Sequence, residues 1–168
     1  MRSQLKIVAL AVAATVLLLP HAGSGDIYDE AASGKRLIDD AVAMAKKQNK
    51  HVLVTWGANW CGWCHRLDEI IKTDSAVAKL IRDYYVPVKI DIGHRDKHMD
   101  LANKYGADLN ELGIPHTTVL DGNGKVVGQI RAQELGDPDD DVEDYTPKMV
   151  ALRLEENKPP TSEPKADE

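Results

Sequence analysis

The sequence predicts an α/β fold in which helices cover both faces of a four-stranded mixed sheet. Amphipathic segments at helical spacing alternate with short β-branched runs along most of the chain. A helical connection between the first two runs favours a parallel strand pair. The turn residues Asp-Gly-Asn-Gly between the last two runs favour an antiparallel hairpin. The predicted order is helix, strand, two helices, strand, helix, hairpin and a final helix.

The first half of this order depends on five segments. Apolar residues at helical spacing predict a helix over 37–45, and a β-branched run predicts a buried strand over 52–56, which ends in Trp56. Apolar residues at helical spacing predict one helix between Cys61 and residues 73–75 and another helix after them. Asp74 or Ser75 can cap the second of these helices. The predicted buried face of that helix is Ala76, Val77, Leu80, Ile81 and Tyr84. The strand over 86–90 contains Pro87, which cannot donate to a central ladder, so this strand is predicted at a sheet edge.

The second half is predicted from turn signals and periodicity. Residues 99–105 are expected to form a short helix and 106–113 an irregular segment. Strands are expected over 117–120 and 126–130. Residues 134–144 carry seven acids and no base, which predicts a solvated loop. The final helix is expected over 145–156, with Pro147 near its first turn.

The two ends of the chain are predicted to lie outside the folded domain. Residues 1–24 resemble a signal peptide, with a basic start and an apolar run over 7–19 that is shorter than the roughly 20 residues of a membrane span. An uncleaved N-terminal anchor is the alternative. One domain is expected over 25–156. Residues 157–168 contain three prolines and no large apolar side chain, which predicts a disordered tail.

Charge and cysteine content restrict the classes of partner. The formal net charge is −6, which disfavours nucleic acid and anionic membrane surfaces as partners. The signal peptide predicts a periplasmic or otherwise extracytoplasmic location, where disulfides persist. The chain has only two cysteines, and a bridge between residues so close together would restrict the unfolded chain little. A chemical role is therefore predicted for them.

Residues 51–67 hold both cysteines and all three tryptophans. Cys61 and Cys64 have C-x-x-C spacing, and Cys61 falls where a predicted strand is followed by the start of a predicted helix. Unpaired backbone N–H groups and the helix dipole at that point favour a thiolate. Cys64, one turn later, is close enough to form a disulfide with Cys61.

Two motifs together resemble the thioredoxin superfamily. The first is Trp60-Cys61-Gly62-Trp63-Cys64 after a β run, and the second is Gly113-Ile114-Pro115 before a hairpin. The resemblance covers residues 37–154 and implies a thioredoxin fold for the domain. The segment from Asn59 to Leu67, together with Asp74-Ser75-Ala76-Val77, is similar to exported thioredoxin-like proteins related to the soluble domains of membrane thiol-electron transporters.

The resemblance implies a role for each motif residue. Cys61 is expected to attack a substrate disulfide and Cys64 to resolve the mixed disulfide. Pro115 matches the family's cis-proline, and the backbone of Ile114 is expected to pair with an extended substrate segment. Trp60 and Trp63 are expected to form the apolar rim of that groove.

The activity implied is that of a protein thiol–disulfide oxidoreductase. We expect it to reduce disulfide-containing protein substrates, with electrons from a membrane thiol donor, as a monomer and without an organic cofactor. A disulfide oxidase or isomerase of the same fold is the alternative direction.

The sequence departs from the family at the position of a buried aspartate. Thioredoxins carry that aspartate in the strand below the active site, and the matching position here is Thr55. Asp68, Glu69 and His65 are the candidates to replace it, and the sequence leaves the choice open. The family's first strand is also not evident before residue 37. His116, next to Pro115, either tunes the thiolate or reflects turn geometry alone.

Three rival functions use the same residues. Cys61-Gly62-Trp63-Cys64-His65 is literally the C-x-x-C-H pattern of c-type haem attachment, with Met99 or another histidine as the distal ligand. Zinc or copper binding would need further ligands from the scattered histidines, of which His94 and His98 are expected to be solvated loop residues. A non-catalytic module that grips extended peptides is the third rival.

Overall fold

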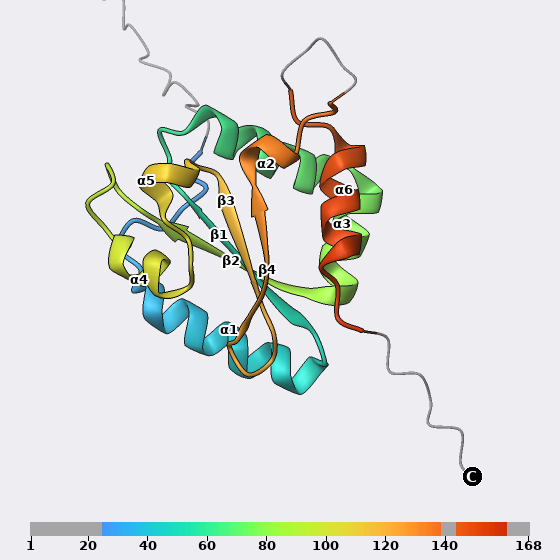
Figure 1. The fold of residues 1–168 in the computed structure, drawn as a ribbon, viewed down its shortest axis with the longest axis horizontal. Helices are drawn as coiled ribbons and strands as arrows, with labels where there is room; N and C mark the ends of the chain where they lie inside the picture. The colour runs from blue at the N-terminus through green and yellow to red at the C-terminus, as the bar shows by residue number, and fades with distance from the viewer. Residues whose placement is uncertain (1–24, 139–143, 161–168) are drawn as a thin grey trace, which may run out of the picture.

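A computed structural model describes residues 25–138 and 144–160 as an α/β domain built around a four-stranded sheet (Figure 1). The strands are β1 (His51–Gly57), β2 (Tyr85–Asp91), β3 (His116–Leu120) and β4 (Val126–Arg131), in the spatial order β2-β1-β3-β4. β1 pairs parallel with β2, whereas β1–β3 and β3–β4 are antiparallel. The predicted fold class is confirmed, and Pro87 lies in an edge strand as expected.

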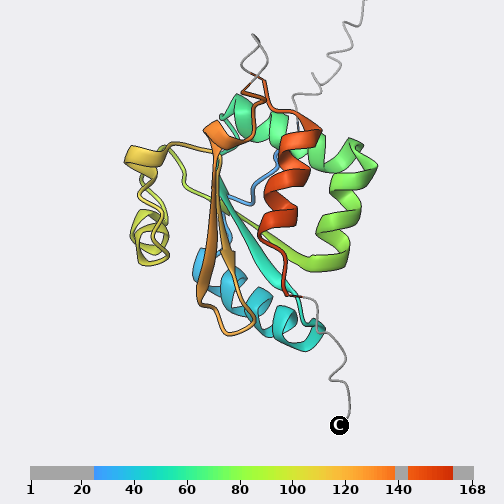
Figure 2. The same ribbon diagram turned by 45° about the vertical axis from the view of Figure 1, so that its right-hand side comes forward.

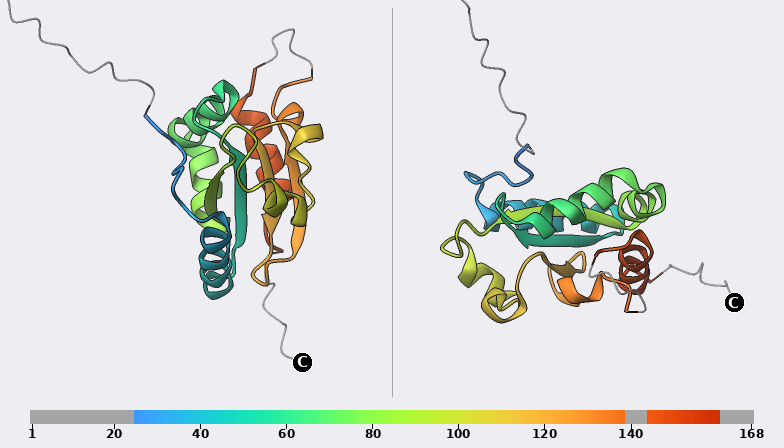
Figure 3. Two further views of the ribbon diagram at one scale, coloured as in Figure 1. Left: turned by 90° about the vertical axis from the view of Figure 1, so that its left-hand side faces the viewer. Right: turned by 90° about the horizontal axis from the view of Figure 1, so that it is seen from above.

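Helices cover both faces of this sheet (Figures 2 and 3). α1 (Gly34–Gln48), α4 (Met99–Lys104) and α5 (Leu109–Leu112) pack on one face, and α2 (Gly62–Thr73), α3 (Ser75–Tyr84) and α6 (Pro147–Glu156) pack on the other. No described strand precedes α1, in agreement with the departure from the family noted in the sequence. Within the described ranges, no helix combines the length and the apolar character needed to cross a bilayer.

Each face of the sheet has its own core, because successive strand residues point to opposite sides. Trp56 of β1 is fully buried on the α1 face, and its indole N–H donates to Thr118 Oγ1 at 3.0 Å. Leu53 of the same strand faces α2, α3 and α6. Burying each large apolar side chain contributes about 1.5–3 kcal/mol. The two cores therefore hold the helices in place on both faces of the sheet.

The junction between α2 and α3 follows the prediction, with one exception. Asp74 caps α3, since its carboxylate accepts from the backbone N–H groups of Ala76 and Val77 at 3.0 and 2.9 Å. Val77 and Ile81 are buried as expected. Ala76 is exposed, so its placement on the buried face was wrong. Adjacent helical positions differ by about 100°, which turns Ala76 toward solvent when Val77 faces the core.

The second half needs three corrections. The segment predicted as irregular contains the one-turn helix α5, which Asp108 caps and which is too short to give a periodic signal. The final helix begins at Pro147 rather than at residue 145, because the Thr146 hydroxyl caps it by accepting from Met149 N–H. The predicted acidic loop is anchored at both ends, where Glu134 pairs with Arg131 and Asp144 with Arg66. Residues 139–143 lie outside the described residues.

The predicted signal peptide and the predicted tail are at the two ends of the chain. The predicted signal peptide, 1–24, and residues 161–168 of the predicted tail lie outside the described residues. The first tail residue, Asn157, is attached to the domain: its carbonyl oxygen lies 2.9 Å from His51 Nδ1, and its side-chain amide donates to Arg153 O. The folded domain therefore extends at least to the end of α6 and its cap.

Candidate active site

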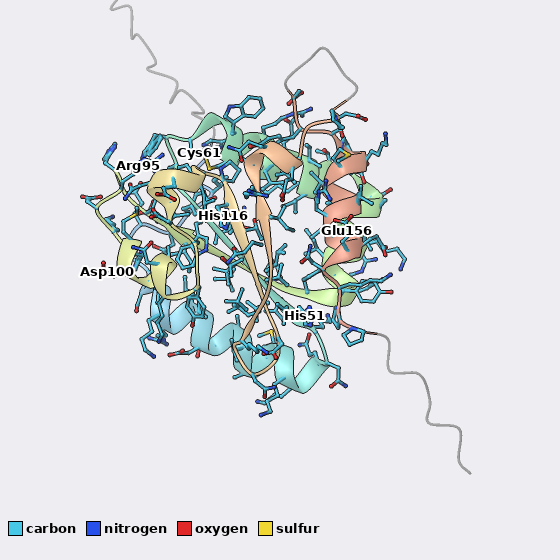
Figure 4. All side chains as sticks on the ribbon, viewed as in Figure 1. His51, Cys61, Arg95, Asp100, His116 and Glu156 are labelled. Carbon is cyan, nitrogen blue, oxygen red and sulfur yellow. A yellow bond between two sulfur atoms is a disulfide. The ribbon has the colours of Figure 1, made fainter. Side chains whose placement is uncertain are left out.

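The two cysteines form a disulfide at the N-terminus of α2, at one end of the sheet (Figure 4). Their Cα atoms are 5.2 Å apart. Cys61 is the N-cap residue, and its Sγ accepts a hydrogen bond from Cys64 N–H at 3.1 Å. Cys61 is 6 % exposed and Cys64 2 %. The backbone of the first helical turn is thus already oriented to stabilise negative charge on the Cys61 sulfur.

The loop before β3 lies directly against Cys61. The Ile114–Pro115 peptide bond is cis, as expected from the second motif. The carbonyl oxygen of Ile114 is 3.9 Å from Cys61 Sγ. The fold therefore brings together two motifs that are about 50 residues apart in the sequence.

A cleft of about 680 Å³ opens beside the disulfide on the Ile114 side. Its floor and walls come from the loop before β3, from η1 (Ala132–Glu134) and from α6, and Trp63 contributes one side. The Trp63 ring is 45 % exposed and packs on the Tyr145 ring, with 4.8 Å between centroids. The cleft is large enough to take an extended peptide segment next to Cys61.

The two tryptophans expected to share a rim lie apart. Trp60 is not among the residues lining the cleft. Its indole N–H donates to Gly93 O at 2.8 Å, and its ring stacks on His94 with 5.9 Å between centroids. Trp63 is therefore the tryptophan at the cleft, whereas Trp60 covers the loop after β2.

The two loop histidines differ from each other. His94 is exposed, as predicted, and stacks on Trp60. The prediction of a solvated His98 was wrong: His98 Nε2 accepts from Gly34 N–H at 3.1 Å, and Nδ1 donates to Asp91 O at 2.8 Å. His98 therefore holds the start of α1 against the end of β2.

Of the three candidates to replace the missing aspartate, two make contacts of another kind. Glu69 is exposed and pairs with Arg66 at 3.1 Å. The His65 ring donates from Nε2 to Asn59 O at 2.7 Å, because a carbonyl oxygen can only accept. That hydrogen bond occupies the ring nitrogen which a haem iron would need, and the two cysteines are bonded to each other.

The third candidate, Asp68, is a buried carboxylate on α2 itself. It is 6 % exposed and pairs with Lys72 at 2.6 Å and with Lys89 of β2. Burial raises the pKa of Asp68, but the hydrogen bonds and charges of the two lysines outweigh this and leave the pKa below its usual value. Lys89 lies opposite Thr55 in the sheet, and the Thr55 hydroxyl is 3.3 Å from that of Thr117. The strand position itself is neutral, and the Asp68 carboxylate of α2 is held by two lysines.

His116 is buried at the start of β3. Its Nε2 donates to Gln129 Oε1 at 2.7 Å, an orientation fixed because the Gln129 amide donates to Tyr105 O. Its Nδ1 is buried with no hydrogen-bond partner in the described structure. Burial lowers the pKa of His116, so the ring is neutral at physiological pH.

Three residues near the disulfide were missed in the sequence. Tyr28 packs in a small apolar cluster with Cys61 and Cys64. Asn59 holds the segment containing Tyr28, and Gly57 leaves room for the Tyr28 hydroxyl. Tyr28 lies in a loop without periodicity, so no local signal connects it to the cysteines. Among the described residues, no three His, Cys, Asp or Glu side chains are grouped so as to hold a metal ion.

Comparison with known proteins agrees with this geometry. The sequence pattern of the thioredoxin-like family matches residues 35–122, which is more than half of the chain. The chain belongs to the thioredoxin-like family. It has the family's fold with the paired cysteines of a thiol–disulfide oxidoreductase, and the predicted resemblance is confirmed.

Individual relatives share the fold to different extents. A disulphide isomerase from Xylella fastidiosa Temecula1 matches with a TM-score of 0.68 and 27 % identity over 80 % of this chain and 98 % of that chain. The C-terminal domain of Neisseria meningitidis DsbD in its oxidised form matches with a TM-score of 0.54 and 17 % identity over 76 % and 97 %. The latter shows the fold alone.

Curated sequences match over a shorter region. The Oryza sativa protein disulfide isomerase-like 2-2 is 40 % identical over 68 residues, which is 40 % of this chain and 17 % of that protein. The chain spans less than a fifth of the length of the curated relatives it matches.

Proposed function

We propose that this protein is an exported thiol–disulfide oxidoreductase that reduces disulfides in extracytoplasmic proteins through the Cys61–Cys64 pair. The observation that carries the proposal is the position of Cys61: it caps α2, accepts the Cys64 N–H and lies 3.9 Å from the Ile114 carbonyl oxygen at the edge of a peptide-sized cleft. Each feature suits a thiolate that attacks an extended substrate.

The reaction balances without an organic cofactor. The Cys61 thiolate attacks one sulfur of the substrate disulfide, which gives a mixed disulfide and releases the other substrate sulfur as a thiolate. Cys64 then loses its proton and attacks Cys61 Sγ. The substrate sulfur that was bound to Cys61 leaves as a thiolate and takes up a proton. The substrate gains two electrons, and the enzyme pair returns to the disulfide seen in the structure.

The proposed partners follow from this cycle. A protein that reduces substrates must itself be reduced, and outside the cytoplasm the electrons have to come from a thiol donor in the membrane. The predicted signal peptide supports export, and the fold likeness to a DsbD domain is consistent with such a chain of thiol exchange. We propose that the protein works as a monomer and needs no nucleic acid or membrane surface.

A disulfide isomerase is the second candidate direction, favoured by the likeness to the Xylella protein. The equilibrium reduction potential separates the two, and Trp63 beside the disulfide provides a fluorescence signal during a thiol-buffer titration. We expect a value near that of thioredoxin, about −270 mV. A value near that of protein disulfide isomerase, about −180 mV, or near that of the strong oxidant DsbA, about −120 mV, would contradict the reducing direction.

Two cysteine variants test the activity itself. Cys61→Ala is expected to abolish reduction of a protein disulfide such as that of insulin, and Cys64→Ala to accumulate mixed disulfides that appear on non-reducing gels. Retained turnover in Cys61→Ala would overturn the mechanism and favour a non-catalytic peptide-binding module. Export is tested separately, by fractionating expressing cells and sequencing the N-terminus of the mature protein.

A further inference from the structure

The segment before α1 is fastened across the buried side of the disulfide. Asn59 Oδ1 accepts from the backbone N–H groups of Ile27 and Tyr28 at 3.0 and 2.9 Å, and its Nδ2 donates to Tyr28 O at 3.1 Å. The same Nδ2 donates to Glu30 Oε1 at 3.0 Å, and Lys97 donates to the Glu30 carbonyl at 3.2 Å. One asparagine, two residues before Cys61, thus fixes the position of this segment.

The fastening brings the Tyr28 hydroxyl next to Cys64. Tyr28 is 4 % exposed and packs with both cysteines. A Cβ built on Gly57 would lie 2.2 Å from the Tyr28 hydroxyl oxygen and 2.7 Å from Cys64 Sγ. The hydroxyl oxygen and the sulfur therefore both border the space above Gly57, which is free only because glycine has no side chain.

Other polar groups below the disulfide are already engaged. The Thr55 hydroxyl faces that of Thr117, and the Asp68 carboxylate is held by two lysines. The charges facing Tyr28 are Asp68 and Asp91, each of which is paired with lysine. Burial, followed by the charges of Asp68 and Asp91, raises the pKa of Tyr28, so the phenol keeps its proton. A protonated phenol is a hydrogen-bond donor and a poor base.

We propose that the Tyr28 hydroxyl donates a hydrogen bond to the Cys64 thiolate when Cys64 resolves the mixed disulfide. This inference rests on the proposed thiol–disulfide exchange and assigns a residue to its second step. Cys64 loses its proton to solvent, and the phenol stabilises the resulting buried charge without being ionised. The thiolate then forms the bond to Cys61 Sγ while the bond from Cys61 to the substrate sulfur breaks. The departing substrate thiolate takes up a proton from solvent.

This role differs from that of a buried aspartate. An aspartate can take the proton from the thiol, whereas a phenol with a raised pKa can only stabilise the thiolate after the proton has left. Thr55 therefore leaves the position of the family's aspartate neutral, and Tyr28 from the N-terminal segment supplies the polar group at Cys64 instead. The device depends on tertiary contact, since Tyr28 and Cys64 are far apart in the sequence.

The test measures the ionisation of Cys64 in a Cys61→Ser background, by thiolate ultraviolet absorbance as a function of pH. Tyr28→Phe keeps the ring and removes the hydroxyl, and we expect it to raise the Cys64 midpoint by about one pH unit. Tyr105→Phe is the matched control, because Tyr105 is half-buried at the end of α4, away from the cysteines. The Cys64 midpoint in Tyr105→Phe should match that of the parent. An unchanged midpoint in a folded Tyr28→Phe protein would overturn the proposal and reduce Tyr28 to packing.

A kinetic measurement distinguishes this inference from the proposed function. With both cysteines present, Tyr28→Phe should leave formation of the mixed disulfide within about twofold of the parent and slow its resolution about tenfold, which corresponds to one pH unit of thiolate stabilisation. Equal slowing of both steps would contradict the proposal. Asn59→Ala, which releases the segment, should reproduce the shift in the Cys64 midpoint, and a parent-like midpoint would also contradict it. Failure of the proposed function would instead appear as absent exchange with the Cys64 shift intact.

Discussion

The two sides of the disulfide differ in what covers them. On the side of Cys61, the Ile114 loop and Trp63 border a cleft of about 680 Å³ that is open to solvent. On the side of Cys64, the segment held by Asn59 packs Tyr28 against the disulfide, and Cys64 is 2 % exposed. One side is arranged to receive a substrate and the other to exclude it.

This difference suits the two halves of thiol exchange. The attacking sulfur must be reached by a large partner, so it needs an open approach and a helix N-terminus that favours its charge. The resolving sulfur needs to reach only Cys61, so it can be enclosed, and enclosure strengthens every hydrogen bond made to it. Four experiments test this contrast, beginning with the largest expected effect.

Filling the space above Gly57 on the enclosed side should cause the largest loss of stability. Gly57→Ala would put a methyl group into the Tyr28 hydroxyl and Cys64 Sγ, and we expect a loss of about 3 kcal/mol in the free energy of unfolding. Gly62→Ala is the matched control, because its Cβ position has no atom within 4 Å apart from its chain neighbours and the backbone of its own helix. Urea unfolding of both variants measures the difference. Equal stabilities would show that the enclosed side is loosely packed.

Removing the buried carboxylate of α2 should have the next largest effect on stability. Asp68→Asn removes the charge that Lys72 and Lys89 surround, and we expect a loss of about 2 kcal/mol near neutral pH, discounted because Lys72 is largely exposed. The pKa of Asp68 is lowered in the folded state, so its contribution is complete above the unfolded pKa and disappears as pH falls through the folded pKa.

The pH dependence provides the check on Asp68. The difference in the free energy of unfolding between the parent and Asp68→Asn should disappear at acid pH, as measured by urea unfolding at several pH values. Asp83→Asn is the control, because the Asp83 partner Lys79 lies on an exposed helix surface and the pair should contribute much less. A gap that stays constant from neutral to acid pH would contradict an ionised Asp68.

On the open side, the expected effect is on substrate binding. Trp63→Ala should raise KM for a peptide disulfide about tenfold, the equivalent of roughly 1.4 kcal/mol, with kcat nearly unchanged. Trp60→Ala should have a smaller effect, because Trp60 lies over the loop at Gly93 and does not line the cleft. Leu152→Ala removes an exposed apolar side chain outside the cleft and is the control. Equal KM increases for both tryptophan variants would support the original expectation that Trp60 and Trp63 form the rim of the groove together.

The smallest effect concerns the histidine after the cis-proline. Because the pKa of His116 is lowered on folding, the unfolded chain binds more protons below the unfolded pKa of about 6.5, and stability should fall by about 1 kcal/mol between roughly pH 7.5 and 5.5. His116→Gln should flatten this dependence, whereas His94→Gln, at an exposed position, should keep it. The same slope in His116→Gln as in the parent would assign the dependence to another group.

Local patterns were sufficient for most of the architecture. The edge position of β2 was predicted from Pro87, because a missing N–H excludes a central strand. The capping of α3 by Asp74 was likewise predicted from a short polar side chain before a helical run. The one-turn helix α5 was missed, since four residues carry no periodicity. His98 was misassigned because its hydrogen bonds reach Gly34, 64 positions earlier.

The sequence by itself determined the fold class, the chemical pair and its partner motif. C-x-x-C spacing at a strand-to-helix junction and Ile114-Pro115 before a hairpin are local patterns, and local patterns can be read without coordinates. Only the tertiary structure decided what surrounds the resolving sulfur. Tyr28 lies before α1, whereas Gly57 ends β1 and Asn59 follows it two residues later. Asn59 holds the segment of Tyr28, and Tyr28 reaches the space between Gly57 and Cys64 because packing depends on distances in space rather than along the sequence.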